Sequence, residues 1–244
     1  MSTSLRILLH GAKGRMGQAI SAAAPAAGVA VVGVDQGDDP APLVPQVDVV
    51  VDFSFHAATA GIAALAARHG KPLVIGTTGH TEPEKVAIRK AVAPIPVVWA
   101  GNYSIGVNLL NALVRRATRV LGEGWDIELV EMHHRLKKDA PSGTAEKLLQ
   151  ILREERRVGA DQLRHGRSGL VGERTPSEIG VHALRGGDVI GDHTVLFASD
   201  GERLELTHKA SSRTIFAQGA LRAARWAIGK PAGIHGMEAV LGLE

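Results

Sequence analysis

The chain has 244 residues, a formal net charge of +3, 3% aromatic residues and no cysteine. This length allows one large α/β domain or two modest ones, of which we expect two, and the missing cysteines exclude disulfides, thiolate metal sites and thiol nucleophiles. Dispersed charge and scarce aromatic residues argue against a nucleic-acid partner. No stretch reaches the ~18 apolar residues of a membrane span, so we expect a soluble, unprocessed, cytoplasmic protein without a membrane partner.

The first hundred residues alternate short apolar runs with alanine-rich stretches of helical pattern. Continuous apolar runs such as Val49-Val50-Val51 are typical of parallel strands that helices cover on both faces. The alternation of strand and helix therefore predicts a doubly wound, Rossmann-like parallel sheet. The expected strands are the runs at 5–11, 29–35, 48–54, 71–79 and 96–101.

After Tyr103 the pattern changes to that of a mixed α+β segment. A helix at 106–122, a strand at 126–134 and a helix after Pro141 precede a polar loop at about 158–176. Strands then follow without helices between them, and Ser199-Asp200-Gly201 is typical of a hairpin turn. These strands are expected at 179–187, 193–200 and 202–210.

A last helix at about 214–228 is apolar enough to pack back on the parallel sheet. The sequence therefore predicts a dinucleotide-binding domain of residues 1–103 that the C-terminal segment 214–244 completes. Residues 104–213 would form a second, mixed α+β domain for substrate binding and oligomerisation.

Three glycines follow the first expected strand at a helix start: Gly11, Gly14 and Gly17, in "GAKGRMG". Glycine there lets the backbone approach a pyrophosphate, and the helix N-terminus meets its charge. The second strand ends at Asp35, close to the spacing of the acid that holds a ribose 2′-hydroxyl in dinucleotide-binding folds. This order favours a dinucleotide site, although the glycines could serve only a tight turn.

The carboxylate of Asp35 would repel a 2′-phosphate, and Gln36 beside it offers no guanidinium. We therefore predict a preference for NADH over NADPH. Arg15, within the glycine turn, could still reach a 2′-phosphate.

Two further loops follow expected strands, at Gly76–Gly79 ("GTTG") and Ala100–Ser104 ("AGNYS"). They should lie at the carboxyl edge of the sheet, where open α/β folds bind ligands. Their small residues allow backbone contact with nicotinamide and ribose, but plain strand-to-helix turns look similar. Phe53 fits either an adenine contact or the core.

The segment "EMHHRLKKDAPSGTA", residues 131–145, brings proton donors in front of a helix start. Asp139 and Ser142 are capping residue types and Pro141 suits a first turn. The N–H groups of Gly143 and Thr144 would then be unpaired, aimed outward and ready to bind a carboxylate.

In the same segment, His133 and His134 should point to opposite sides of an extended strand, so that one serves the reaction and the other the substrate. A lysine beside other cations can donate a proton, and the surrounding positive charge attracts an acidic substrate. We interpret Lys138 as a solvated charge. Two other interpretations of the histidine pair are a metal site, for which no further ligands stand at suitable spacing, and a structural pair.

Several polar residues further along cannot be placed from their spacing. Lys209 and Arg213 in "THKASSR" either line the same anion site or only leave the sheet. The others are Arg174, His182, Arg185 and His193.

Together these motifs closely resemble the dihydrodipicolinate reductase family of the diaminopimelate route to lysine. The likeness runs nearly end to end, through "GAKGRMG", "GTTG", "GNYSIGVN", "EMHHRLKKDAPSGTA", "GERTPSEIG", "RGGDVIGDHTV" and "LTHKASSR". It implies reduction of 4-hydroxy-tetrahydrodipicolinate, a small dianion, to tetrahydrodipicolinate with NADH or NADPH. It also implies a homotetramer built through the sheets of the second domain. The chain is shorter than many members, and Gln36 stands where some dual-specificity members have arginine.

The resemblance implies roles for single residues as well. His133 would be the acid/base and Lys137 the proton donor, while His134, Gly143 and Thr144 would bind substrate. No residue is assigned to a metal. The cofactor would be held by Gly11, Ala12, Lys13, Gly14, Arg15, Met16, Asp35, Gly76, Thr77, Thr78, Ala100, Gly101, Asn102 and Tyr103.

Two other functions stay open from the sequence. One is another nicotinamide-dependent amino-acid dehydrogenase, such as an aspartate dehydrogenase. The other is a non-catalytic NADH-sensing protein, which would bind the dinucleotide but has no need of the proton donors in residues 131–145.

Overall fold

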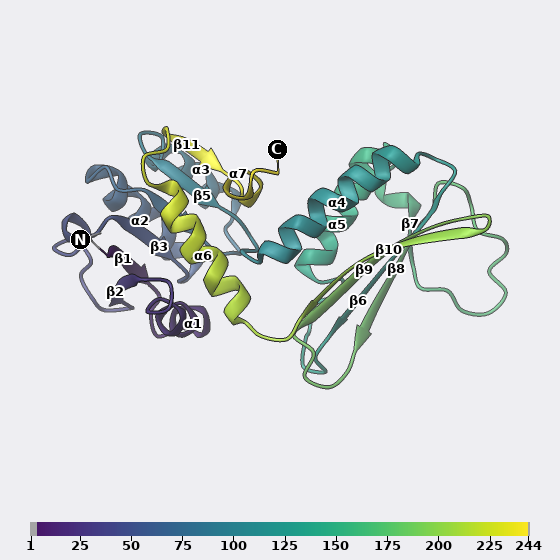
Figure 1. The fold of residues 1–244 in the computed structure, drawn as a ribbon, viewed down its shortest axis with the longest axis horizontal. Helices are drawn as coiled ribbons and strands as arrows, with labels where there is room; N and C mark the ends of the chain where they lie inside the picture. Colours follow the sequence, from purple (N-terminus) through teal and green to yellow (C-terminus); the bar gives the residue numbers. More distant parts are fainter. Residues whose placement is uncertain (1–3, 244) are drawn as a thin grey trace. The chain divides into compact units, whose positions relative to one another are not determined.

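The computed structural model describes residues 4–243, which form two compact units. The first unit comprises the residues up to Ile105 and from Arg213 onward, and the second comprises Gly106–Ser212. Each unit is built on one sheet (Figure 1). Within the described residues no helix is long and apolar enough to cross a membrane.

The first unit contains a six-stranded sheet in the order β11-β5-β4-β3-β1-β2, with every neighbouring pair parallel. This confirms the doubly wound parallel sheet. The strand β11 (Gly233–His235) was not predicted, because three residues that begin with a glycine carry no strand pattern and gain their conformation by pairing with β5. The expected strands are β1 (Leu5–His10), β2 (Val29–Val34), β3 (Val49–Asp52), β4 (Leu73–Ile75) and β5 (Pro96–Trp99).

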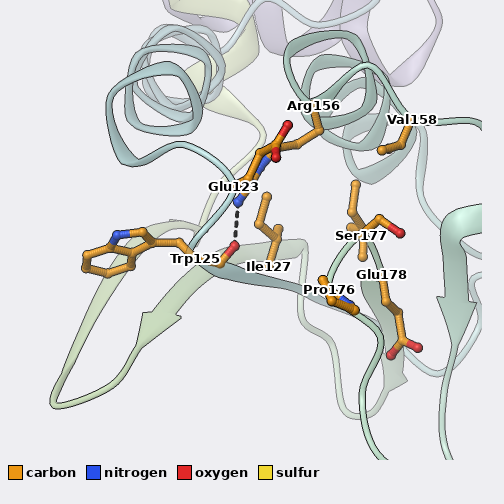
Figure 2. A pocket seen from close by; sticks show the side chains of 9 residues that line it. Glu123, Trp125, Ile127, Arg156, Val158, Pro176, Ser177 and Glu178 are labelled. Carbon is orange, nitrogen blue, oxygen red and sulfur yellow. Dashed lines mark hydrogen bonds between the residues drawn. The ribbon is translucent and has the colours of Figure 1, made fainter.

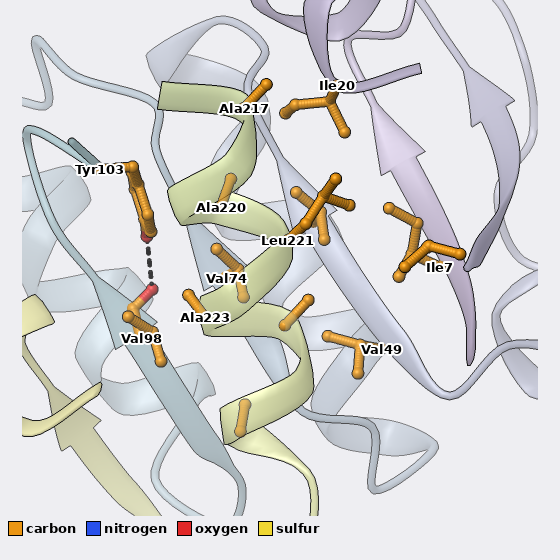
Figure 3. Packing of buried hydrophobic residues seen from close by; sticks show 14 of the residues in the cluster. Ile7, Ile20, Val49, Val74, Val98, Tyr103, Ala217, Ala220, Leu221 and Ala223 are labelled. Atoms are coloured by element: carbon orange, nitrogen blue, oxygen red, sulfur yellow. Dashed lines mark hydrogen bonds between the residues drawn. The ribbon is translucent and has the colours of Figure 1, made fainter. Parts of the chain in front are cut away.

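Helices cover both faces of this sheet, and alternate strand residues serve the two resulting cores. Ile7 and Leu9 pack in one cluster with α1 (Arg15–Ala23), α6 (Thr214–Ala227) and the short α7 (Met237–Leu241). Leu8, between them, packs in the other cluster with α2 (His56–Arg68) and α3 (Glu82–Ala91). The prediction that the last long helix returns to the parallel sheet is confirmed (Figure 3). A short 3-10 turn, η1 (Val44–Gln46), precedes β3.

Helix α6 approaches the loop after β5 closely enough to require glycine. A Cβ on Gly219 would stand 1.7 Å from the carbonyl oxygen of Tyr103. Tyr103 is itself buried, and its hydroxyl lies 2.8 Å from the Ile75 carbonyl and 2.9 Å from the Val98 carbonyl, the second of which Figure 3 marks. The loop after β5 is therefore clamped between the sheet and α6.

The second unit contains a mixed sheet in the order β10-β9-β6-β8-β7. α4 (Ile105–Leu121) and α5 (Gly143–Arg156) pack on one of its faces through apolar residues of β6, β8 and β9. The hairpin is confirmed, because Ser199 pairs with Glu202 across the Asp200-Gly201 turn. The strands are β6 (Asp126–His133), β7 (Leu163–His165), β8 (Ile179–Arg185), β9 (Gly191–Ser199) and β10 (Glu202–Ala210).

The expected loop at about 158–176 is confirmed for residues 166–176, but its first part contains two short elements that were not predicted. A 3-10 turn, η2 (Ala160–Gln162), leads into β7, which pairs in parallel with β8 at the sheet edge. Such a three-residue strand has no periodic pattern of its own, and it forms because β8 offers an unpaired edge.

Replacing Gly219 by alanine should destabilise the first unit by at least about 2 kcal/mol, because the new methyl group collides with backbone that cannot move freely. Gly61, on the exposed side of α2, is the matched control, since a Cβ there meets nothing within 4 Å. Gly61→Ala should stabilise by up to about 1 kcal/mol. Chemical denaturation of both variants measures the difference, and equal stability would contradict the proposed close contact.

Candidate functional site

The second unit holds one group of candidate site residues, on β6 and the segment that follows it. Glu131 and His133 stand on the buried face of β6, as the two-residue period of a strand requires. The chain then runs into α5, whose N-cap Ser142 accepts a hydrogen bond from the Ala145 N–H. Pro141 therefore precedes the cap instead of lying in the first helical turn.

Glu131 is the polar centre of this group. It is fully buried, and its Oε2 lies 2.6 Å from Nδ1 of His133. Arg185, at the end of β8, donates to both carboxylate oxygens, at 2.8 and 2.9 Å. Burial alone would raise the pKa of Glu131, but the hydrogen bonds from Arg185 and His133 outweigh it and hold that pKa below its usual value.

His193 on β9 completes the buried cluster. Its ring meets that of His133 edge to face with centroids 5.2 Å apart, and its Nε2 lies 2.8 Å from the hydroxyl oxygen of Ser142. Burial, with the nearby His133 as a second cause, lowers the pKa of His193 to about 4. His193 is therefore neutral at physiological pH and links β9 to the cap of α5.

Lys137 lies between the two anchored ends of the segment. Its Nζ is 2.7 and 2.8 Å from the carboxylate oxygens of Asp139, and this bond is the main reason that the pKa of Asp139 is lowered. Asp139 thus holds the lysine and caps no helix, unlike the sequence expectation. Lys138 is exposed, in agreement with its interpretation as a solvated charge.

The other predicted substrate residues lie next to this cluster in the chain. His133 is buried whereas His134 is partly exposed, and the His134 N–H donates to the Val189 carbonyl at 2.7 Å. Gly143 and Thr144 are the first two residues of α5. The structure therefore places His133, Lys137 and the helix start on one continuous segment, while their roles stay predictions.

Sequence reasoning could not place Arg185 and His193, although both belong to this cluster. Their positions depend on strand register: His133 pairs with Arg185 across β6 and β8, and Glu131 pairs with His193 across β6 and β9. The sequence signal that could have indicated these two residues is a polar side chain at a core-facing position of an otherwise apolar strand. Lys209 pairs with Asp192, one step out of phase with His193, and so lies on the other face of the sheet.

The first unit holds the glycine turn at the carboxyl end of β1. Gly11 has a φ of +87°, and a Cβ on it would stand 2.4 Å from the Phe53 carbonyl oxygen. A Cβ on Gly17 would meet the Gly11 carbonyl oxygen at 2.2 Å. These two glycines bring the start of α1 tightly against the strand ends, which leaves backbone instead of side chains at the sheet edge.

Asp35 follows β2 and is tied to this turn. Its carboxylate accepts hydrogen bonds from the Lys13 N–H at 2.7 Å and the Gln36 N–H at 2.9 Å. The bond from Lys13 is the main cause of a lowered pKa for Asp35, and the bond from Gln36 adds to it. The acid is therefore ionised and oriented, and a carboxylate with two such bonds retains further lone pairs for hydroxyl groups.

A second buried carboxylate, Asp52, organises the strand ends. It accepts from the hydroxyls of Ser54, Thr59 and Thr77 at 2.5–2.8 Å and lies 2.7 Å from Nδ1 of His10. Thr77 thus turns its side chain inward, so that the predicted cofactor contacts of Gly76–Thr78 fall to backbone and to the exposed Thr78.

Two aromatic residues near this edge belong to the core. Phe53 packs against the cluster under α6 and lies 5.4 Å, centroid to centroid, from the ring of Tyr103. Phe53 also fills the place where a Cβ on Gly76 would stand. Tyr103 is buried, so any cofactor contact in Ala100–Tyr103 must come from backbone or from its partly exposed neighbours.

The second unit also contains a cavity of about 170 Å³ (Figure 2). Trp125, Ile127 and Val158 line it, and Arg156 donates to the Trp125 carbonyl beside it. No predicted site residue borders it.

Comparison with known proteins assigns the whole chain to one family. The N-terminal family model of dihydrodipicolinate reductase matches residues 5–103, and the C-terminal model matches residues 106–241. The chain belongs to the dihydrodipicolinate reductase family. This confirms the family resemblance that the sequence motifs indicated.

Two members of the dihydrodipicolinate reductase family illustrate how far the similarity extends. The 4-hydroxy-tetrahydrodipicolinate reductase of Akkermansia muciniphila is 56% identical over 242 residues, which cover 98% of each chain. The enzyme of the same name from Anaeromyxobacter sp. (strain Fw109-5) is 51% identical over 236 residues, or 96% of this chain and 88% of the relative.

Similar solved structures confirm the fold of this chain. A dipicolinate-bound dihydrodipicolinate reductase from Paenisporosarcina sp. TG-14 superposes with a TM-score of 0.77 at 22% identity, over 96% of this chain and 98% of that one. A putative myo-inositol dehydrogenase from Sinorhizobium meliloti 1021 reaches 0.62 at 11% identity, over 98% and 94% of the chains. At such identities the likeness concerns the architecture alone.

The neutral buried His193 should make the second unit of this reductase-family chain acid-sensitive. An unfolded histidine titrates near 6.5, whereas buried His193 stays neutral down to about 4, so the free energy of unfolding falls as the pH drops through this window. The stabilising contribution of neutral His193 is fully present above the window. The loss is about 2 kcal/mol at pH ~4.5. Hydrogen exchange of β6 and β9 amides at pH ~7 and ~4.5 should show a pH difference that is smaller in His193→Gln. An equal pH difference in the variant would contradict this role.

Proposed function

We propose that the chain reduces 4-hydroxy-tetrahydrodipicolinate to tetrahydrodipicolinate with a nicotinamide coenzyme, the step that the family serves in the diaminopimelate route to lysine. The observation that supports the proposal is that one segment of this family member carries His133, Lys137 and the start of α5. The reaction consumes a hydride and a proton and releases water, so the protein must bind a dianion and manage a proton.

The residues of the second unit fit these two tasks. Gly143 and Thr144, at the positive end of a 14-residue helix, suit a substrate carboxylate. The ammonium of Lys137 can protonate the substrate or stabilise negative charge that develops on it. His133, held by Glu131 through Nδ1, would act as acid or base through Nε2, and His134 would contact the substrate.

The first unit fits a dinucleotide. At the start of α1 the N–H groups of Arg15, Met16 and Gly17 have no backbone partner among the described residues, and Gly11 and Gly14 in the turn before them carry no side chain. These groups would hold the pyrophosphate, and Asp35 would hold ribose hydroxyls. When bound, the nicotinamide supplies the hydride. Gly76–Thr78 and Ala100–Tyr103 would hold the remainder largely by backbone.

Within this proposal the preferred coenzyme is NADH. The carboxylate of Asp35 is ionised and fixed by the Lys13 and Gln36 N–H groups, so a 2′-phosphate would face a charge that cannot turn away. Arg15 is exposed in the same turn. Arg15 and Lys13 are the two cations of the segment 11–17 that could offset this repulsion.

We also propose a homotetramer that forms through the sheet of the second unit. Helices α4 and α5 pack on one face of that sheet (Figure 1). On the other face Met132 and Leu184 are direct neighbours across β6 and β8, and Leu184 is 48% exposed. Apolar side chains there would gain from burial against a second copy.

A coupled assay tests the proposed reaction and ranks the coenzymes. A dihydrodipicolinate synthase would generate the substrate from pyruvate and aspartate semialdehyde, while absorbance of the reduced coenzyme is followed. We expect substrate-dependent oxidation, with a higher kcat/KM for NADH than for NADPH. Asp35→Asn keeps an oxygen for the Lys13 N–H but removes the charge, so it should raise the NADPH-to-NADH ratio of kcat/KM by about tenfold.

Two results would contradict these expectations separately. A wild-type kcat/KM tenfold higher for NADPH would overturn the coenzyme preference but not the reaction. Binding of NADH without turnover would favour a sensor, and turnover of L-aspartate with NAD would favour an amino-acid dehydrogenase.

Replacing Lys137 by alanine should lower kcat by about 10²-fold or more, the usual scale for loss of a general acid, and leave NADH binding within twofold. Lys138→Ala is the matched control, because this neighbouring lysine is exposed and should keep wild-type kcat. Steady-state kinetics and a fluorescence titration with NADH measure the two quantities. Wild-type kcat in Lys137→Ala would refute its role as proton donor.

A further inference from the structure

The buried carboxylate of Glu131 contacts both parts of the proposed substrate site. Oε2 bonds to Nδ1 of His133 at 2.6 Å, and Oε1 accepts the N–H of Ser142, the N-cap of α5, at 3.2 Å. One side chain therefore joins the proposed acid/base to the start of the proposed anion-binding helix.

Arg185 makes this arrangement stable in a buried place. A lone buried carboxylate would take up a proton, but the two parallel bonds from the guanidinium balance its charge and fix its plane. Arg185 also donates to the carbonyl oxygen of Asp139 at 2.7 Å. The Glu131–Arg185 pair thus holds the loop that carries Lys137 near both of its ends.

The pair has a chemical consequence for His133. An ionised carboxylate only accepts hydrogen bonds, so Nδ1 of His133 must carry the proton that it shares with Glu131. Nε2 is then the nitrogen left for proton exchange with substrate. Gly191 on β9 keeps space beside it, since a Cβ there would stand 2.9 Å from Nε2.

We propose that Glu131 is a positioning residue of the reductase site, which sets the tautomer of His133 and fixes the start of α5 relative to it. The proposal rests on the proposed function for its catalytic meaning. Its structural content, the protonation of Nδ1 and the anchoring of the helix cap, stands on the hydrogen bonds alone.

Glu131→Gln is the direct test. The amide has one oxygen and one NH2 group where four N–H groups from His133, Arg185 and Ser142 converge, so Arg185 and either His133 or Ser142 must lose an acceptor. We expect kcat to fall at least about tenfold while the dissociation constant of NADH stays within about twofold. The pH profile of kcat should move to lower pH, because a protonated His133 would keep the cation Arg185 nearby but lose the carboxylate oxygen that both side chains share.

Glu155→Gln is the matched control within the same unit. Glu155 near the end of α5 is also largely buried and bonded to two arginines, Arg115 at 2.5 Å and Arg119 at 2.5 and 2.9 Å. It lies 12 residues along the helix from Gly143, or about 18 Å at the helical rise per residue. This variant also breaks the bonds between a carboxylate and two arginines in the second unit, yet it should keep the wild-type pH profile.

A measurement on the wild-type protein separates this proposal from the proposed function. ¹⁵N NMR of histidine-labelled protein, with His133→Asn for assignment, should show neutral His133 protonated at Nδ1, and it requires no turnover and no folded variant of Glu131. An Nε2-protonated His133, or an unchanged kcat and pH profile in Glu131→Gln, would overturn the positioning role. Absent turnover with Nδ1 protonated would instead refute the function and leave the geometry intact.

Discussion

The ion pair between Glu131 and Arg185 is the interaction on which the proposed substrate site of the second unit depends. Removing a carboxylate and a guanidinium from water is costly, and a buried pair repays the cost only when the remaining donors and acceptors are satisfied. Here they are: the carboxylate also receives His133 and the Ser142 N–H, and the guanidinium also donates to Asp139. The pair therefore favours one arrangement of β6, β8 and the segment leading into α5.

The proposed coenzyme site of the first unit also has a buried carboxylate, whose partners are hydroxyl groups and an imidazole. Asp52 is fully buried and gathers three hydroxyls and His10, which come from the ends of β1 and β3, the start of α2 and the loop after β4. Glycine supplies the other requirement, because Gly11 and Gly17 allow backbone contacts that any side chain would block. In both units a buried acid fixes loop segments at the ends of strands, and in the open parallel sheet of the first unit these ends are where such folds bind ligands.

How far the sequence predicts this molecule depends on whether a feature is local. Long strands and helices have periodic patterns, and the glycine turn and the hairpin have their own turn chemistry, so these were predicted correctly. β7 and β11 were missed because each has three residues and forms only against a neighbouring strand. Pro141 was expected in the first turn of α5 and Asp139 among its capping residues, because both residue types suit a helix start. In the structure the N-cap is Ser142, whose hydroxyl oxygen accepts the Ala145 N–H.

The candidate site shows the same division. His133, Lys137 and the start of α5 were found because they share one run of residues. Arg185 and His193 lie 52 and 60 positions beyond His133, and only the pairing of β6 with β8 and β9 brings them beside it. A solved structure described as a putative myo-inositol dehydrogenase has a similar architecture at 11% identity, so the architecture alone does not select the reaction. In this chain β6, β8 and β9 place His133, Arg185 and His193 around one carboxylate in front of a helix start, and the proposed reaction depends on that set of polar groups.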